Sequence, residues 1–246
     1  MRYFIELSYK GTAYHGWQKQ PDAISVQEVL EKALSVLLRE TVAIVGAGRT
    51  DTGVHASQIF AHFDFTELNC TQLTRKLNSY LPSDIAIHGI QEMYDEAHAR
   101  FDAISRSYEY VITKNKNPFT TELAFYFKPE LDVEKMNEAA KVLFNYENFK
   151  CFSKSKTDVK TYHCIITEAE WKWKGNELIF FVSANRFLRN MVRAIVGTLL
   201  EVGLGKMEVA EMHEVIKSQN RGKAGASVPG HALYLTKVEY PREIFK

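Results

Sequence analysis

The sequence predicts an α+β fold of two similar lobes, each an antiparallel sheet with helices on its outer face. The 246 residues are 46% apolar and 25% charged, a length and composition that suit one large or two modest domains. Apolar patterning up to residue 91 gives elements in the order β-α-β-β-α-β, and a similar order recurs loosely after residue 106. We therefore expect an N-terminal lobe over residues 1–104 and a C-terminal lobe over residues 105–246.

The composition also limits the class of protein, because it excludes disorder, collagen and coiled coil. The three cysteines, Cys70, Cys151 and Cys164, form no CxxC pair and are odd in number, which indicates a reducing compartment without a disulfide framework or zinc site. Glu6 interrupts any signal-peptide core, and the apolar run 194–200 is short and bounded by charges. A soluble cytoplasmic protein with no membrane association is the expectation.

The elements of the first lobe follow from apolar periodicity and helix-capping residues. Residues 2–9 alternate as a half-buried strand does. Ser25 and Glu28 form an S-x-x-E capping box, which predicts the start of a helix. The apolar stripe that follows at helical spacing is expected to face the core: Val26, Val29, Leu30, Ala33, Leu34, Leu37 and Leu38. The remaining elements expected here are a strand at 41–45, a loop at 46–56, a strand at 58–65, a helix at 71–80 and a strand at 84–91.

The second lobe has one clear turn signal and one clear signal for the end of a helix. Lys174-Gly175-Asn176 predicts a hairpin turn between two strands. Gly203 and Gly205 predict the end of the apolar helix at 188–202. The other elements expected in this lobe are a strand at 107–113, a helix at 133–144, a basic loop at 150–160, strands at 162–173 and 177–184, a short helix at 208–218 and a strand at 232–240.

The charge is nearly balanced overall, at +1, but it is unevenly spread along the chain. If the basic stretches converge in space, they make a local positive field that holds phosphates. The alternative is that these side chains lie on solvated loops, and charge alone does not decide between the two. The basic residues concerned are Lys150, Lys154, Lys156, Lys160, Arg186, Arg189, Arg193, Lys217, Arg221 and Lys223.

The densest group of unusual residues is the loop at 46–56, which holds three glycines with Arg49, Asp51 and His55 between two apolar strands. Glycines here indicate backbone conformations or close approaches that a β-carbon forbids. The spacing matches no phosphate-binding loop, and Asp51 would repel a phosphate. No third ligand with recognisable spacing supports a metal site. A carboxylate near an arginine on such a loop favours nucleophilic or acid–base chemistry.

The segment Gly48-Arg49-Thr50-Asp51-Thr52-Gly53-Val54-His55-Ala56 closely resembles the signature of the tRNA pseudouridine synthase A family. Several further motifs match in the same order, which makes a chance resemblance very improbable. They are Tyr14-His15-Gly16-Trp17-Gln18, Ser25-Val26-Gln27-Glu28, Leu81-Pro82-Ser83-Asp84-Ile85, His98-Ala99-Arg100-Phe101-Asp102-Ala103, Arg106-Ser107-Tyr108-Glu109-Tyr110, Phe187-Leu188-Arg189-Asn190-Met191-Val192-Arg193 with Ile195-Val196-Gly197, and Leu233-Tyr234-Leu235. Residues 115–128 and 225–232 match less well.

The resemblance implies the pseudouridine synthase fold, with the two lobes joined around a central RNA-binding cleft. It implies isomerisation of uridine to pseudouridine at positions 38, 39 and 40 of the tRNA anticodon stem-loop, without cofactor or metal. It also implies a homodimer that shares one tRNA between two subunits. The family's nucleophilic aspartate falls on Asp51. Whether that carboxylate attacks the uracil ring or the ribose C1′ stays open.

The resemblance gives two further residues catalytic roles. It places Arg193 beside the aspartate, where its positive charge would keep the enclosed carboxylate ionised. The helical pattern alone predicts that Arg193 is a charge on the protein surface. The resemblance places Tyr108 against the target base, either stacking on it or transferring a proton at C5. Stacking is the better-founded role, because a tyrosine hydroxyl with its ordinary pKa is a poor base at neutral pH. Tyr108 and Tyr110 alternate on one strand, so both could also belong to the core.

RNA binding is expected to involve residues from several motifs. The target uridine lies in or beside a stem and must be turned out of the stack, and Arg49 is placed to hold its phosphate or fill the gap. The resemblance makes His98, Arg100 and Phe101 an RNA-contacting segment, with Arg100 as the phosphate contact. Lys160, in the basic loop, is a further RNA contact on a weaker match.

Four other residues are expected to be structural or to position RNA rather than to perform chemistry. These are His15 and His55, despite their suitable titration range, and the packing residues Trp17 and Trp171. Three alternative functions remain: a non-catalytic tRNA-binding chaperone of the same fold, a paralogue that modifies other uridines, and an Asp/His hydrolase of small molecules. The last predicts no salt-sensitive RNA binding.

Overall fold

A computed structural model describes residues 1–155 and 159–246 of the chain, which divide into two units. Unit 1 comprises Met1–Ser105 together with Tyr234–Lys246, and unit 2 comprises Arg106–Leu233. The prediction assigned the C-terminal residues to the second lobe, whereas in the structure they group with the first. The reason is the pairing of the last strand, described below.

The sheet of unit 1 is built around the first strand. β1 (Arg2–Tyr9) lies between β3 (His55–Asp64) and β4 (Ile85–Met93) and is antiparallel to both. β2 (Val45–Gly46) is a short antiparallel partner of β3. β9 (Leu233–Glu239) pairs with β3 in parallel. A parallel partner at the start of β3 brings the end of the chain into the first unit.

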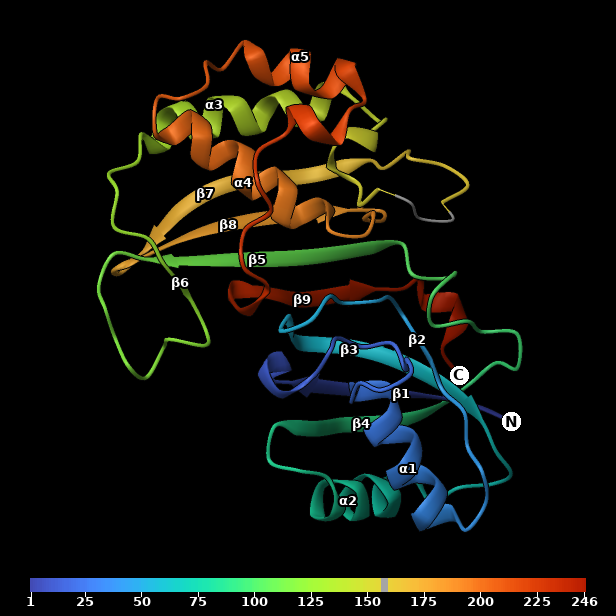
Figure 1. Cartoon of the computed structure of the whole chain (residues 1–246). Coiled ribbons are helices and arrows are strands. Elements are labelled where there is room, and N and C mark those ends of the chain that lie inside the picture. Colours follow the sequence, from blue (N-terminus) through green and yellow to red (C-terminus); the bar gives the residue numbers. More distant parts are fainter. Residues whose placement is uncertain (156–158) are drawn as a thin grey trace. The chain divides into compact units, whose positions relative to one another are not determined.

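The helices of unit 1 lie on one side of this sheet (Figure 1). α1 (Val26–Leu38) begins as the capping box predicts, because the Ser25 hydroxyl oxygen accepts a hydrogen bond from the backbone N–H of Glu28 at 3.3 Å. α2 (Cys70–Tyr80) contacts both α1 and β4 and is capped by the side chain of Asn69. The fully buried side chains of α1 are Val26, Leu30, Ala33 and Leu34. These belong to the predicted apolar stripe.

The strand expected at 41–45 forms only at its end, as Val45 within β2. Two backbone N–H groups of this segment bond to side chains of α1 instead of to a neighbouring strand. Val42 donates to the Ser35 hydroxyl at 3.0 Å, and Ile44 donates to the Glu31 carboxylate at 3.2 Å. The β-branched pattern predicted the extended conformation but not these competing side-chain acceptors.

The C-terminal residues bury the second face of the unit 1 sheet. Phe4 packs with Met93 in a cluster against which Tyr240 and Phe245 lie. The Tyr240 hydroxyl also donates to the carbonyl oxygen of Ala99 at 2.6 Å. Apolar burial on both faces of β1 therefore requires the end of the chain, which explains why unit 1 is discontinuous in sequence.

The sheet of unit 2 is antiparallel in its long strands. β8 (Glu177–Ala184) lies between β5 (Ser105–Thr113) and β7 (Ile166–Lys174). The turn between β7 and β8 contains Gly175 with φ +60°, as the hairpin signal predicts. β6 (Phe125–Tyr126) is a short parallel partner of β5 that the sequence did not predict.

Figure 1 shows the helices of unit 2 on one side of its sheet. α4 (Met191–Gly203) packs on α3 (Val133–Lys141), which contacts β7. α5 (Glu211–Ser218) is shorter than predicted. Within α4, every residue is buried except Arg193 and Glu201, which are half-buried. Short 3₁₀ helices occur at Gly11–Ala13, Val142–Asn145, Lys150–Phe152, Arg221–Lys223, Gly230–Ala232 and Arg242–Ile244.

Both units combine helices with a mainly antiparallel sheet, so the predicted α+β class is confirmed. None of the helices found in residues 1–155 and 159–246 has the length and apolar character needed to cross a membrane.

Candidate active site

The backbone around Asp51 lies directly against the segment that follows β1. Gly16 has φ +86°, and a β-carbon added there would overlap the carbonyl oxygen of Thr50. A β-carbon at Gly11 would overlap the carbonyl oxygen of Val54. Both glycines are therefore required by a close approach of two backbone segments, one on each side of Asp51.

Hydrogen bonds join the same two segments. The hydroxyl groups of Tyr9 and Thr50 are 2.8 Å apart, and the N–H of Gly53 donates to the carbonyl oxygen of Tyr14 at 3.2 Å. Thr50 is buried and Asp51 is half-buried. The aspartate is thus held on a loop whose backbone is constrained by its neighbours, which suits a side chain that must be presented in one geometry.

We expect Gly16→Ala to lower the free energy of unfolding by roughly 2–4 kcal/mol, since it combines a positive φ with a clash against Thr50. Gly48→Ala is the matched control in the Asp51 loop, because a β-carbon at Gly48 meets no atom within 4 Å. Urea unfolding of both variants measures the difference. Equal stability of the two variants would show that the close approach does not constrain the loop.

Two aromatic residues beside this loop, His55 and Trp17, are structural. His55 is 2% exposed, and its Nδ1 accepts a hydrogen bond from the N–H of Gly11 at 2.9 Å while its ring stacks on Tyr234 at 4.6 Å. The indole of Trp17 fills the space that a β-carbon at Gly46 would need. Trp17 and Trp171 are both buried, which confirms their predicted packing roles.

Arg49 lies two residues before Asp51 and is exposed. Its Nε donates a hydrogen bond to the side-chain oxygen of Gln18 at 3.0 Å. The arginine and the aspartate thus share one loop of unit 1, and the arginine is held by a residue of the neighbouring segment.

The structure distinguishes the two tyrosines of β5 that the sequence left as equivalent core candidates. Tyr110 is 0% exposed and its hydroxyl donates to the carbonyl oxygen of Pro229 at 3.1 Å. Burial raises the pKa of Tyr110, and the nearby guanidinium of Arg193 opposes part of that rise. Tyr108 is only half-buried, and its ring meets Phe187 edge to face at 5.2 Å. Tyr108 therefore keeps part of its surface available for contact, whereas Tyr110 belongs to the core.

Arg193 is not the solvated surface charge that helical periodicity alone suggests. Its Nε donates to the carbonyl oxygen of Val228 at 2.7 Å, and the N–H of Val228 donates to the Arg193 carbonyl oxygen at 3.2 Å. The segment that carries Val228 lies close against α4, because a β-carbon at Gly197 would overlap the carbonyl oxygen of Ala226. A half-buried guanidinium with this fixed orientation fits a functional cation.

The rings of His62, His98 and Phe101 lie one after another in unit 1, and we refer to them as the ring column. His98 and Phe101 belong to the predicted RNA-contacting segment. The ring of His98 lies 4.6 Å from that of His62 and 4.2 Å from that of Phe101. The Nδ1 of His98 accepts hydrogen bonds from the N–H groups of Arg100 and Phe101 at 3.1 and 3.2 Å. Phe101 is 72% exposed, and the guanidinium carbon of Arg100 lies 5.7 Å from its ring centroid. A supported, exposed aromatic face beside an arginine has the composition of a nucleobase platform.

The base of this column is expected to make unit 1 sensitive to acid. Burial lowers the pKa of His62 to about 4, and its Nδ1 accepts the N–H of Ala99 at 3.1 Å. An unfolded histidine has a pKa near 6.5, so between these values the unfolded state binds more protons than the folded state. Stability should therefore fall as the pH is lowered through this window, by roughly 1–3 kcal/mol from this group.

His62→Asn should reduce that acid sensitivity, because an amide oxygen can accept from Ala99 without titrating. His88→Asn replaces an exposed histidine of β4 and should leave the sensitivity unchanged. Urea unfolding at pH 7 and pH 4.5 gives the comparison. If His62→Asn and the unmodified protein lose equal stability, another group carries the acid sensitivity.

The basic loop of unit 2 is only partly described. Lys160 is exposed, and the ammonium of Lys150 lies 5.6 Å from the ring centroid of Tyr162. Lys156 lies outside the described residues. The RNA contact proposed for Lys160 thus remains a prediction supported by exposure and charge.

Comparison with known proteins identifies the family. A family model described as tRNA pseudouridine synthase matches residues 7–102 and 139–241. The chain therefore belongs to the tRNA pseudouridine synthase family. The protein named tRNA pseudouridine synthase A in Parabacteroides distasonis is 53% identical over 99% of this chain and 98% of its own length. The protein of that name in Bacteroides fragilis is 53% identical over 100% of this chain and 98% of its own length. The protein named tRNA pseudouridine synthase A 2 in Clostridium perfringens is 41% identical over 96% of this chain and 98% of its own length.

Membership of the tRNA pseudouridine synthase family confirms the predicted resemblance, the enzyme class of isomerase and the α+β pseudouridine synthase fold. Within unit 1 the structure brings Arg49 and Asp51 onto one constrained loop. Within unit 2 it leaves Tyr108 half-exposed and holds Arg193 against Val228. Sequence reasoning missed the side-chain partner of Arg49, although Gln18 stands in one of the quoted family motifs.

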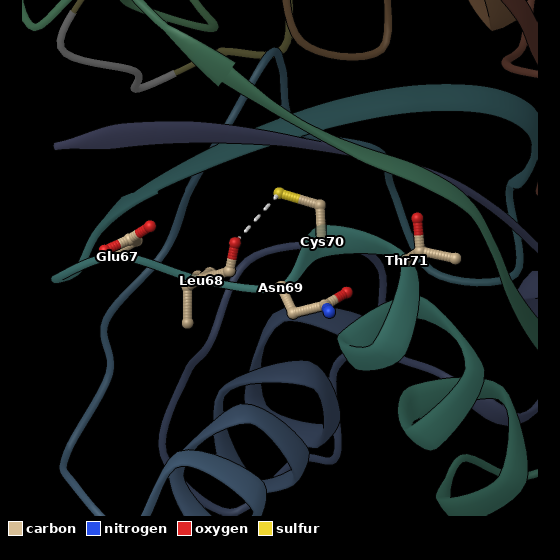
Figure 2. Close-up of a pocket in the computed structure, with 5 residues that line it drawn as sticks. All are labelled: Glu67, Leu68, Asn69, Cys70 and Thr71. Atoms are coloured by element: carbon tan, nitrogen blue, oxygen red, sulfur yellow. Dashed lines mark hydrogen bonds between the residues drawn. The ribbon is translucent and has the colours of Figure 1, made fainter.

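The hollow at the start of α2 is unrelated to the residues predicted for this pseudouridine synthase. Figure 2 shows its lining, which is formed by Glu67, Leu68, Asn69, Cys70 and Thr71. The thiol of Cys70 lies 3.9 Å from the carbonyl oxygen of Leu68, and burial raises its pKa. A thiol with a raised pKa is a weak nucleophile. Over residues 1–155 and 159–246, no group of three or more metal-ligating side chains is found.

Proposed function

We propose that this pseudouridine synthase isomerises uridine at positions 38, 39 and 40 of the tRNA anticodon stem-loop, with Asp51 as the nucleophile. The observation that carries the proposal is the constrained loop at Asp51, where Gly11, Gly16 and Tyr9 fix the backbone around a half-buried carboxylate. A loop so restricted costs conformational free energy, and such a cost is typical of sites where one side chain must keep a single orientation. The type of reaction is inferred from the family, and Asp51 is proposed as the nucleophile because of its loop.

The proposed chemistry needs no outside atoms. The uracil leaves C1′ through N1 and rejoins through C5, while the proton lost from C5 is balanced by one gained at N1. A carboxylate suits this reaction because it can form a transient bond either to the ring or to C1′, and both routes remain open. We assign Arg193 as the cation that keeps the Asp51 carboxylate ionised, and Tyr108 as the ring that stacks on the target base. We expect no cofactor or metal.

Access to a stem uridine requires the nucleotide to leave the helix. We assign Arg49 to this step, because it is exposed, lies two residues before Asp51 and is held by Gln18. Its guanidinium would bind the phosphate of the everted nucleotide or occupy the space that the base vacates.

The ring column of unit 1 supports binding of the rest of the stem-loop. We assign Phe101 to a base contact and Arg100 to a phosphate contact, with His98 fixing the turn between them. Lys160 is assigned to the RNA backbone. We further propose that the active form is a cytoplasmic homodimer that binds one tRNA across both copies.

The proposal is tested by mapping pseudouridines in tRNA from cells that lack the gene. We expect pseudouridine to disappear from positions 38, 39 and 40 and to return when the gene is restored. Loss at other positions, with these three intact, would assign the chain to a paralogue with another target. Unchanged tRNA, together with tight tRNA binding, would favour a chaperone.

A further inference from the structure

Arg49 stands at the end of a chain of side-chain hydrogen bonds that begins on α1. Its Nε donates to Gln18 Oε1 at 3.0 Å, and Gln18 Nε2 donates to Gln27 Oε1 at 2.7 Å. Gln27 Nε2 in turn donates to Glu31 Oε1 at 3.0 Å and to the carbonyl oxygen of Ile44 at 3.0 Å. We refer to Gln18 and Gln27 as the glutamine pair.

The direction of this chain is dictated by groups whose hydrogen-bonding roles cannot change. Gln27 Oε1 accepts from the backbone N–H of Lys19 at 2.9 Å, and the carbonyl oxygen of Ile44 can only accept. These two backbone groups set which end of the Gln27 amide carries the oxygen. Gln18 must then turn its NH₂ group toward Gln27, so its own oxygen faces Arg49.

The Arg49 end of this series of hydrogen bonds is equally constrained. The Nε of an arginine can only donate, so it requires the acceptor that Gln18 presents. Glu31 also accepts the N–H of Ile44 at 3.2 Å, which ties α1 to the strand segment before the Asp51 loop. The hydrogen bond to Gln18 sets the direction in which the Nε–H of Arg49 points, although the side chain is exposed.

We propose that the glutamine pair are positioning residues that orient the guanidinium of Arg49 for eversion of the target uridine. The inference rests on the role proposed above for Arg49 and names the residues through which that role is controlled. It also accounts for two family motifs, those containing Gln18 and Gln27, that the chemistry at Asp51 does not explain. An exposed arginine without this support would sample many rotamers, and small misplacements of a contact in the transition state are costly.

The test compares kcat/KM on two tRNAs that differ in one base. One carries a paired target uridine in the stem, and in the other the opposing base is changed so that the uridine is unpaired and easier to evert. Gln18→Met removes both hydrogen bonds of Gln18 while keeping its length. We expect about a 10-fold loss on the paired substrate and less than about a 2-fold loss on the unpaired one.

The double variant separates positioning from a structural effect. In the Arg49→Ala background, Gln18→Met should cause no further loss, because the residue that it orients is absent. Gln27→Met should reproduce the Gln18→Met pattern, and thermal unfolding of each variant shows that it is folded. Gln20→Met is the matched control, since Gln20 lies on the same segment and its amide donates to the carbonyl oxygen of His15 at 2.9 Å.

Two outcomes overturn the inference in different ways. Equal losses for Arg49→Ala on the paired and unpaired substrates would overturn the eversion role of Arg49 and the inference with it. A paired-substrate loss for Arg49→Ala, combined with additive effects of Gln18→Met, would leave Arg49 in its role and overturn only the glutamine pair. The nucleophile assigned to Asp51 is tested independently below.

Discussion

Replacing Asp51 with asparagine is expected to lower pseudouridine formation by at least about 10³-fold while tRNA affinity changes by less than about 3-fold. Asparagine has nearly the shape of aspartate, so the loop held by Gly16 and Tyr9 should keep its conformation. What is lost is the charged oxygen that we propose forms a bond during the reaction. Single-turnover release of tritium from C5 of the target uridine measures the rate, and filter binding measures the affinity.

Asp22→Asn is the matched control for Asp51→Asn. Asp22 is exposed and has φ +57°, a conformation that asparagine tolerates as well as aspartate. We expect its rate to remain within about 2-fold of the unmodified protein. Substantial turnover by Asp51→Asn would remove Asp51 as the nucleophile, whereas weakened tRNA binding with no change in the bound rate would assign it to substrate positioning.

Asp51 could be proposed as the nucleophile from sequence because its segment resembles the family signature, whereas the composition of the loop by itself favoured only nucleophilic or acid–base chemistry. The need for glycine at two positions of the neighbouring segment, which follows β1, could not be predicted. Gly11 and Gly16 are necessary because they touch the backbone at Val54 and Thr50, far along the chain. Periodicity and turn signals describe near neighbours in sequence, so a requirement set by a distant segment is visible only in the structure.

The fold shows the same division between local and distant causes. The capping box at Ser25 and the turn at Gly175 are local signals, and both predictions hold. The segment 41–45 has a strand pattern, but two of its backbone N–H groups donate hydrogen bonds to side chains of α1 instead of to a neighbouring strand. The parallel pairing of β9 with β3 joins segments that are far apart in the sequence, and no local pattern specifies it.

The two tyrosines of β5 show how burial resolves an ambiguity of pattern. Tyr108 and Tyr110 have the same spacing and the same face, so periodicity cannot separate them. The difference arises from their neighbours. The hydroxyl of Tyr110 donates a hydrogen bond to the carbonyl oxygen of Pro229 in the core, whereas Tyr108 meets the ring of Phe187 edge to face and stays half-buried. Arg193 is a similar case, since its contact with Val228 joins positions that are distant in sequence.

Arg193→Lys is expected to lower kcat by about 10²-fold with little change in KM. Lysine keeps the positive charge but has no counterpart of Nε, so the bond that orients the guanidinium on Val228 is lost. A cation that must lie in one direction to keep a carboxylate reactive should therefore fail in this variant. The measurement is steady-state turnover on tRNA, with thermal unfolding to confirm the fold.

Glu201→Gln provides the comparison for Arg193→Lys, because Glu201 is the other charged residue within α4 and is also half-buried. It should change kcat by less than about 2-fold, so that a general effect of altered charge in this helix is excluded. Arg193→Met should be at least as inactive as Arg193→Lys, since it removes the charge as well as the orientation. If lysine retains full activity while methionine does not, charge alone is sufficient at this position, and the bond to Val228 serves stability rather than catalysis.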